Sequence, residues 1–378
     1  MVGQESAHRD VGCSCEGLTK KQPRRRRLAL AALAVLLLGI VAALGPRVVP
    51  RLAAAPLPQV PQDPRALQAW IDAREAATPG LRADTRARIV WADPAHPART
   101  GCAIVYLHGF SASQGEGAPA HQRLARRFGC NLYLPRLPGH GLQADDALRD
   151  IDAQRLLDAA AEALAVGQAL ADRVVLIGTS MGGALAVQTA AAHPQRVQAL
   201  VLWSPLVRER DDQLQPLLWP WGAQLLWSRN GGDPILRHPV ASAYWASAIH
   251  VDGYRALVAL SRAGMVAATF ANVRMPVFLG YYYRDARHQD PTVSVAAMRT
   301  MFAELATPQA QREMVDFPLA GDHVIASPLR SRSAPQVFAA TCRFLAARAG
   351  LAAAPGAPDC ASAWAYYGQA PAAVAAHR

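Results

Sequence analysis

The stretch RVVLIGTSMGGALAV, residues 173–187, decides the fold of this chain. Its apolar start predicts a buried strand, and the alanine-rich run after it predicts a helix. Between the two lies a G-x-S-x-G motif, in which Gly178 and Gly182 flank Ser180. A serine on such a tight strand-to-helix turn is strained, and only small neighbours fit around it. The stretch therefore predicts a nucleophile elbow that presents Ser180 to a substrate.

Seven apolar runs of this kind alternate with alanine-rich stretches along the chain. Continuous apolar runs separated by helices are typical of a parallel sheet covered on both faces, so we predict the α/β class. The runs span residues 87–92, 103–109, 131–136, 173–178, 197–204, 276–283 and 313–318.

Residues 205–275 break this rhythm and predict a helical cap inserted into the sheet domain. The segment is long and carries four tryptophans, Trp219, Trp221, Trp227 and Trp245. Such aromatic side chains suit a pocket for an apolar acyl or aryl group, or ordinary packing between helices.

Two further segments carry a family resemblance. The sequence HGF follows an apolar run at 108–110, and residues 135–141 read P-x-x-x-G-H-G. With the G-x-S-x-G motif they make the chain similar to the α/β-hydrolase family, and the second segment is common in carboxylesterases and monoglyceride lipases. The resemblance implies a mostly parallel sheet flanked by helices, with Ser180 as nucleophile. It also implies an oxyanion hole formed by the backbone N–H groups of Phe110 and Met181.

The order of the triad in this family is serine, acid, histidine, so the base follows Ser180. The resemblance indicates His323, which lies in the turn AGDH after the last apolar run. The remaining histidines after the serine lie in the tail, inside other elements or ahead of the better acid: His193, His238, His250, His288 and His377.

Two aspartates compete for the role of the acid. In the family it commonly follows the strand glycine by three residues, but counted from Gly280 that position is Tyr283. Asp290 begins the sequence DPTV, which resembles the family's D-x-x-V, and a loop insertion explains the spacing. Asp285 is the alternative, with a surface ion pair to a neighbouring arginine as its structural role.

Composition excludes several chemistries. The 378 residues are 52% hydrophobic, enough for a globular core. The only lysines are Lys20 and Lys21, so the body of the chain has no amine for a Schiff base, a pyridoxal phosphate anchor or a phosphate loop. No H-E-x-x-H, C-x-x-C or G-x-G-x-x-G pattern occurs in a suitable context, so we expect no metal and no cofactor.

The formal charge of +11 does not indicate nucleic acid as a partner. Residues 1–27 hold seven basic and three acidic residues, which account for +4 of it. The other arginines are scattered rather than interleaved with aromatic residues, as on a solvated surface.

We therefore predict a serine hydrolase that cleaves small carboxylic esters, with an apolar acyl group, through an acyl-enzyme intermediate. Amide, peptide or thioester hydrolysis on the same fold is an alternative, since fold does not fix function. A non-catalytic binding protein at a membrane is an alternative of another class.

The amino-terminal region predicts that the protein is directed to a membrane. Residues 28–44 are uncharged and apolar, just long enough to span a bilayer. Basic residues before this run exceed those after it, which favours a cytoplasmic amino terminus and a catalytic domain on the periplasmic or extracellular side. A cleaved signal peptide with a site near residues 53–55, giving a secreted protein, is the alternative, and a buried core helix is a third interpretation.

The six cysteines suit that location. Cys102 and Cys130 each precede an apolar run. If these runs form neighbouring parallel strands, both thiols lie at the same edge of the sheet. Cys342 and Cys360 would join the last helix to the tail. Disulfides and buried free thiols both fit the first pair. Cys13 and Cys15 lack a zinc or redox spacing and receive no role.

These patterns divide the chain into five parts. We predict a basic cytoplasmic segment at 1–27, a transmembrane anchor at 28–45, a proline-rich linker at 46–66, a hydrolase domain at 67–350 and an alanine- and proline-rich tail at 351–378. The composition of the tail predicts loose order, although Trp364, Tyr366 and Tyr367 offer docking groups.

Overall fold

The computed structural model describes residues 22–46, 50–240 and 242–369, and the chain divides into the units Met1–Arg47 and Val48–Arg378. Cys13, Cys15 and His377 lie outside the described residues. In the first unit, α1 (Gln22–Leu44) is a single helix with an apolar run at residues 28–44, and its segment Arg24–Leu44 is long and apolar enough on average to cross a membrane. It begins six residues before the predicted anchor because arginine is a good helix former and extends it backwards.

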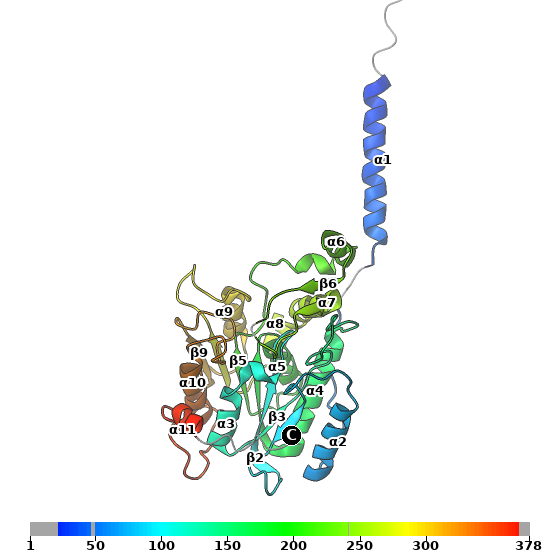
Figure 1. Ribbon diagram of the computed structural model, residues 1–378. Helices are drawn as coiled ribbons and strands as arrows, with labels where there is room; N and C mark the ends of the chain where they lie inside the picture. The colour runs from blue at the N-terminus through cyan, green and yellow to red at the C-terminus, as the bar shows by residue number, and fades with distance from the viewer. Residues whose placement is uncertain (1–21, 47–49, 241, 370–378) are drawn as a thin grey trace, which may run out of the picture. The chain divides into compact units, whose positions relative to one another are not determined.

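A seven-stranded sheet forms the centre of the second unit, and it confirms the predicted α/β class (Figure 1). The strand order is β1-β3-β2-β4-β5-β8-β9, and all neighbours are parallel except β1, which runs antiparallel to β3. Each predicted apolar run overlaps one strand. The strands are β1 (Arg88–Val90), β2 (Thr100–Leu107), β3 (Asn131–Leu134), β4 (Ala171–Thr179), β5 (Ala199–Trp203), β8 (Val277–Tyr281) and β9 (Arg312–Asp316).

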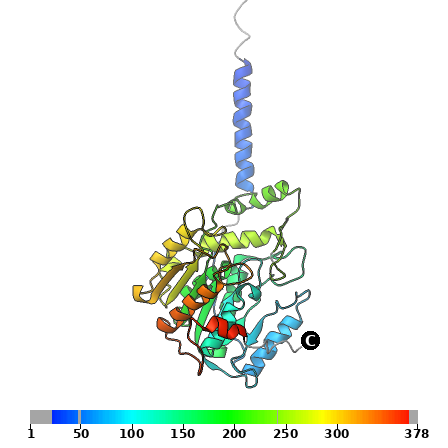
Figure 2. The ribbon, with the colours of Figure 1, turned by 60° about the vertical axis from the view of Figure 1, so that its left-hand side comes forward.

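Helices cover both faces of this sheet because its side chains alternate between two buried cores. In β2, Val105 and Leu107 point into one core, while Ile104 and Tyr106 point into the other. Figures 1 and 2 show the two helical layers. The first core is covered by α2 (Pro64–Ala76), α4 (Ala153–Leu170), α5 (Met181–Ala192) and α9 (Val295–Glu304), and the second by α3 (Ala120–Phe128) and α10 (Ala334–Ala347).

The segment between β5 and β8 is less helical than its composition predicted. It contains α6 (Gly222–Arg229), α7 (Val251–Ala259), a π-helical turn at Leu260–Gly264 and α8 (Ala267–Phe270). It also contains a two-stranded antiparallel sheet, β6 (Ile235–Arg237) with β7 (Ala248–His250).

The linker and the tail both pack on the hydrolase body. Ala55 is buried, and its carbonyl oxygen lies 2.8 Å from Nε2 of His193. In the tail, α11 (Ala363–Gln369) places Trp364 against the Phe338 ring and under the guanidinium of Arg123. The residues up to 369 are thus docked rather than loose.

Two disulfides close the pairs that the spacing suggested. Cys102 is bonded to Cys130 across the starts of β2 and β3, and Cys342 of α10 is bonded to Cys360 of the tail. Both alternatives for the first pair were open from the sequence, and the structure pairs the thiols because the parallel register brings the two strand starts to one edge.

Candidate active site

Ser180 sits at a strained turn between β4 and α5. Its φ is +54° and its ψ is −119°, a conformation that costs a residue with a side chain about 1–3 kcal/mol. Backbone hydrogen bonds hold it: its N–H donates to the Trp203 carbonyl at 3.1 Å, and its carbonyl oxygen accepts from Leu206 N–H at 2.9 Å. The neighbouring strand β5 thus fixes the elbow in place.

The two flanking glycines are required by close approach of backbone. A Cβ at Gly178 would clash with the backbone of Gly182. A Cβ at Gly182 would clash with the carbonyl group of Leu107 in β2. This is the physical content of the G-x-S-x-G spacing: the turn is too tight for any side chain at these two places.

His323 and Asp290 form a buried pair. His323 lies in the loop after β9, and its Nδ1 is 2.8 Å and 3.0 Å from the two carboxylate oxygens of Asp290. Asp290 is fully buried, and its Oδ1 accepts the backbone N–H groups of Thr292 and Val293. The D-x-x-V pattern therefore has a structural cause, since the residues that follow the aspartate orient its carboxylate.

The pair is electrostatically coupled. Burial disfavours the imidazolium, but the charge and hydrogen bond of Asp290 outweigh burial and raise the pKa of His323 above 6.5. Burial also disfavours the carboxylate, yet His323 and the backbone donors lower the pKa of Asp290. The Nε2 atom of His323 is buried and has no hydrogen-bond partner in the described part of the chain, so it is free to take a proton.

The structure separates Asp285 from this pair. Asp285 is exposed and its carboxylate lies 2.8 Å from Nδ1 of His288, with Arg284 beside it. The surface ion pair considered as its structural role is therefore present. The other described histidine candidates also have partners elsewhere: His193 with Ala55, His238 with Tyr254 and His250 with Asp252.

The loop after β2 brings Phe110 to the same place. The Phe110 ring packs against Tyr254 of α7, with ring centroids 5.0 Å apart. Next to it, His108 is buried, and burial lowers its pKa to about 4, so it is neutral. Its Nε2 accepts the N–H of Leu137 at 3.2 Å, which makes it a support for the loop. Met181 is the first residue of α5, so its N–H has no partner within the helix.

Ser180, His323 and Phe110 line one cavity of about 330 Å³. The buried side chain of Glu116 lines it as well. Its wall is mixed, with apolar and charged side chains from the segment after β5 and from the loop after β8: Leu206, Glu209, Arg210, Asp211, Gln213, Leu214, Trp245, Leu257, Pro291, Thr292 and Val293. Of the four tryptophans, only Trp245 lines this cavity.

Glu116 is the residue that sequence reasoning missed. It lies in a short 3-10 helix at Gln114–Gly117 and is 2% exposed. Burial raises its pKa to about 7. A glutamate between two glycines in a polar loop gives no pattern that distinguishes it from a surface residue, so only the folded chain reveals it.

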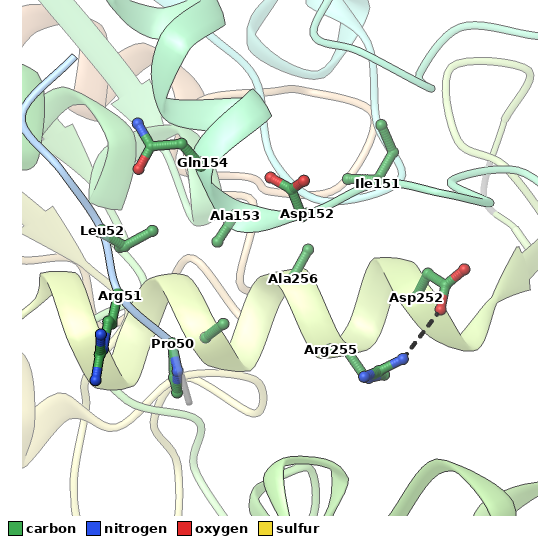
Figure 3. Close-up of a pocket in the computed structure, with 11 residues that line it drawn as sticks. Pro50, Arg51, Leu52, Ile151, Asp152, Ala153, Gln154, Asp252, Arg255 and Ala256 are labelled. Carbon is green, nitrogen blue, oxygen red and sulfur yellow. Dashed lines mark hydrogen bonds and ion pairs between the residues drawn. The ribbon is translucent and has the colours of Figure 1, made fainter. Parts of the chain in front are cut away.

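A second cavity, of about 290 Å³, lies between the chain at Pro50 to Leu52, the start of α4 and α7 (Figure 3). Of its charged groups, Asp252 pairs with Arg255, and Asp152 caps α4 by accepting the N–H of Arg155. No serine, cysteine or histidine lines it. Among the described residues no cluster of histidine, cysteine and acidic side chains is suited to a metal ion.

Comparisons with known proteins agree with the α/β-hydrolase fold of the chain. Residues 99–242 match the family model described as serine aminopeptidase, S33. A pimeloyl-acyl-carrier-protein methyl ester esterase of Nitrosomonas europaea is 35% identical over 123 residues, which are 32% of this chain and 42% of the relative. The chain thus spans less than half of that relative's length.

Two solved structures share the fold. A structure from a study of LipS and LipT, two metagenome-derived lipolytic enzymes, has a TM-score of 0.57 at 16% identity and covers 70% of this chain and 99% of that one. A soluble variant of monoglyceride lipase from Saccharomyces cerevisiae, in complex with a substrate analog, has a TM-score of 0.51 at 12% identity and covers 69% and 90%. At these identities the likeness concerns the fold alone.

Proposed function

We propose that the chain hydrolyses carboxylic esters, with Ser180 as nucleophile, His323 as general base and Asp290 as the acid that orients it. The observation that carries the proposal is the buried pair of His323 and Asp290, whose His323 lines one cavity with a strained serine. A buried imidazole held at Nδ1 by a carboxylate, with Nε2 unpartnered, is the arrangement that removes a proton from an alcohol.

The reaction has two steps. His323 takes the proton of Ser180 as the serine oxygen attacks the ester carbonyl, and the imidazolium then protonates the leaving alcohol. Water deprotonated by the same histidine releases the acid. In both steps the N–H groups of Phe110 and Met181 stabilise the negative oxygen, and each such donor is worth about 3–4 kcal/mol of transition-state stabilisation.

Hydrolysis of amide bonds is the second candidate, since the matching family model is described as a serine aminopeptidase. The 35% identity to a methyl ester esterase favours the ester. The cavity volume of about 330 Å³ suits a small or medium acyl group.

We expect purified protein to hydrolyse p-nitrophenyl esters with a preference for short and medium acyl chains, and to hydrolyse matched anilides at least about a hundredfold more slowly. The measurement is kcat/KM for acetate, butyrate, octanoate and palmitate esters beside the corresponding anilides and thioesters. Faster cleavage of an anilide than of its ester would make the chain an amidase. A folded sample that neither turns over any substrate nor reacts with a fluorophosphonate probe would favour a binding protein.

We also propose that the apolar helix α1 anchors the chain in a membrane, with the hydrolase unit on the non-cytoplasmic side. The apolar stretch at 28–44, the basic residues before it and the two disulfides support this location. Secretion after cleavage is the other outcome, because a signal sequence passes the same test of length and composition.

In a bacterial host, alkaline phosphatase fused after Arg51 is expected to be active, because it folds only in an oxidising compartment. A cytoplasmic reporter fused at the same residue is expected to be inactive. The matched control is a fusion after Arg27, ahead of the apolar run, where both results reverse. Activity of the cytoplasmic reporter after Arg51 would contradict the orientation, and recovery of a shortened chain in the soluble fraction would show cleavage.

A further inference from the structure

The role of Glu116 needs an explanation beyond burial and packing. It is buried, and it lines the same cavity as Ser180 and His323. A carboxyl group transferred from water to such a place is costly unless hydrogen bonds compensate for the loss of water. The partners of Glu116 therefore indicate what it does.

One partner belongs to the loop that carries Phe110. The N–H of Gly109 donates to Oε2 of Glu116 at 2.6 Å, a short hydrogen bond of the charge-assisted kind. Gly109 directly precedes Phe110, whose N–H is the proposed oxyanion donor. The carboxylate thus fixes the peptide next to that donor. A side chain at Gly109 would clash with Glu116, so the two groups are in close contact.

A second partner leads to the nucleophile. The hydroxyl of Tyr106 lies 3.1 Å from Oε2 of Glu116 and 3.0 Å from Oγ1 of Thr179. Thr179 directly precedes Ser180. Through Tyr106, the carboxylate thus connects the oxyanion loop with the elbow.

The segment between β5 and β8 also lies beside Glu116, because Trp245 lines the same cavity and contributes to lowering the pKa of the carboxyl group. The residue after Trp245 is bound to the oxyanion loop: Ala246 N–H donates to the Ser111 carbonyl at 2.8 Å. The loop that Glu116 holds through Gly109 is therefore also tied to the segment that walls the cavity.

Charge connects Glu116 to the base. The titratable groups that act on Glu116 are Tyr106 of β2 and His323 of the loop after β9. The acidic groups that act on His323 are Asp290, Glu116 and Asp322, in this order. Asp322 is also paired with Arg330 at 2.7 Å, so Glu116 is the second carboxylate that faces the imidazole from inside the cavity.

We propose that Glu116 is a positioning residue for the proposed ester hydrolysis: its carboxylate holds the oxyanion loop through Gly109 and adds negative charge beside His323. This inference rests on the proposed function. It assigns Glu116 no contact with the reacting atoms.

The test measures how fast a fluorophosphonate labels Ser180 between pH 5 and 9, which needs no natural substrate. The rate rises with pH as His323 loses its proton. Glu116→Gln keeps the shape but removes the charge that the carboxyl group carries above pH about 7, so the pKa of His323 falls and the rising limb moves to lower pH by about 0.5–1 unit. Its rate above the limb falls about tenfold, since a neutral amide oxygen holds the Gly109 N–H less strongly than a carboxylate does. Glu116→Asp keeps the charge but draws back from Gly109, so its limb stays in place and its rate falls at least tenfold.

The matched control is Glu162→Gln, a change of the same kind on α4, where Glu162 pairs with Arg74. It is expected to match wild type in both limb and rate. The inference would be overturned if Glu116→Gln showed its rising limb at the wild-type pH and a labelling rate within twofold of wild type. Labelling of the wild type would still uphold the proposed function in that case. If Glu116→Gln melts below the assay temperature, Glu116→Asp decides, and a rate equal to wild type overturns the inference. If the fluorophosphonate failed to label the wild type at any pH, that result would instead contradict the proposed function.

Discussion

Ser180→Ala is expected to reduce kcat for p-nitrophenyl butyrate by at least about 10⁴-fold and to abolish fluorophosphonate labelling. The hydroxyl oxygen of Ser180 is the atom that bonds to the acyl group in the acyl-enzyme. Alanine has no hydroxyl, so His323 has no proton to remove. The fold should tolerate the change, because the hydrogen bonds that hold residue 180 to Trp203 and Leu206 come from the backbone.

The control for this variant is Ser113→Ala. Ser113 is a buried serine of the neighbouring loop whose hydroxyl contacts the Tyr244 carbonyl at 3.2 Å. We expect this variant to keep its labelling and to lose some stability only. Labelling that survives in Ser180→Ala but disappears in another serine variant would move the nucleophile elsewhere and end the proposal.

Asp290→Asn is expected to lower kcat by about 10⁴-fold with little change in KM. An amide in this place can present an N–H to Nδ1 of His323, which favours the tautomer whose Nε2 carries the proton and cannot act as a base. It also removes the charge that stabilises the imidazolium. The backbone N–H groups of Thr292 and Val293 still have an oxygen to bind, so the loop should keep its shape.

Asp285→Asn is the matched control, since it makes the same change five residues earlier. Asp285 pairs with His288 at the surface, so its loss should alter kcat by less than twofold. The steady-state kinetics of the two variants separate the aspartates that the sequence left open. A large loss in Asp285→Asn with none in Asp290→Asn would reverse the assignment.

The structure explains why the acid was ambiguous from the sequence. The loop after β8 carries a turn in which the N–H groups of Arg287 and His288 bind the Asp285 carboxylate. That turn adds residues between Gly280 and Asp290, so the usual spacing from the strand glycine fails. The D-x-x-V pattern is independent of that spacing because it reflects hydrogen bonds within four residues.

The sequence by itself determined the features that depend on local chemistry. Apolar runs and alanine-rich stretches predicted all seven strands of the sheet, and two glycines around Ser180 predicted the elbow, because backbone crowding there admits no side chain. The apolar helix before the body was equally plain, since length and hydropathy define it.

Only the tertiary structure decided the features that depend on distant contacts. The pairing of His323 with Asp290 joins loops after two different strands, and Glu116 gains its partners from β2 and from the loop that follows it. The two-stranded sheet within that segment and the docking of the tail likewise depend on which surfaces meet. A sequence does not distinguish a solvated carboxyl group from a buried one, because burial is set by the rest of the fold.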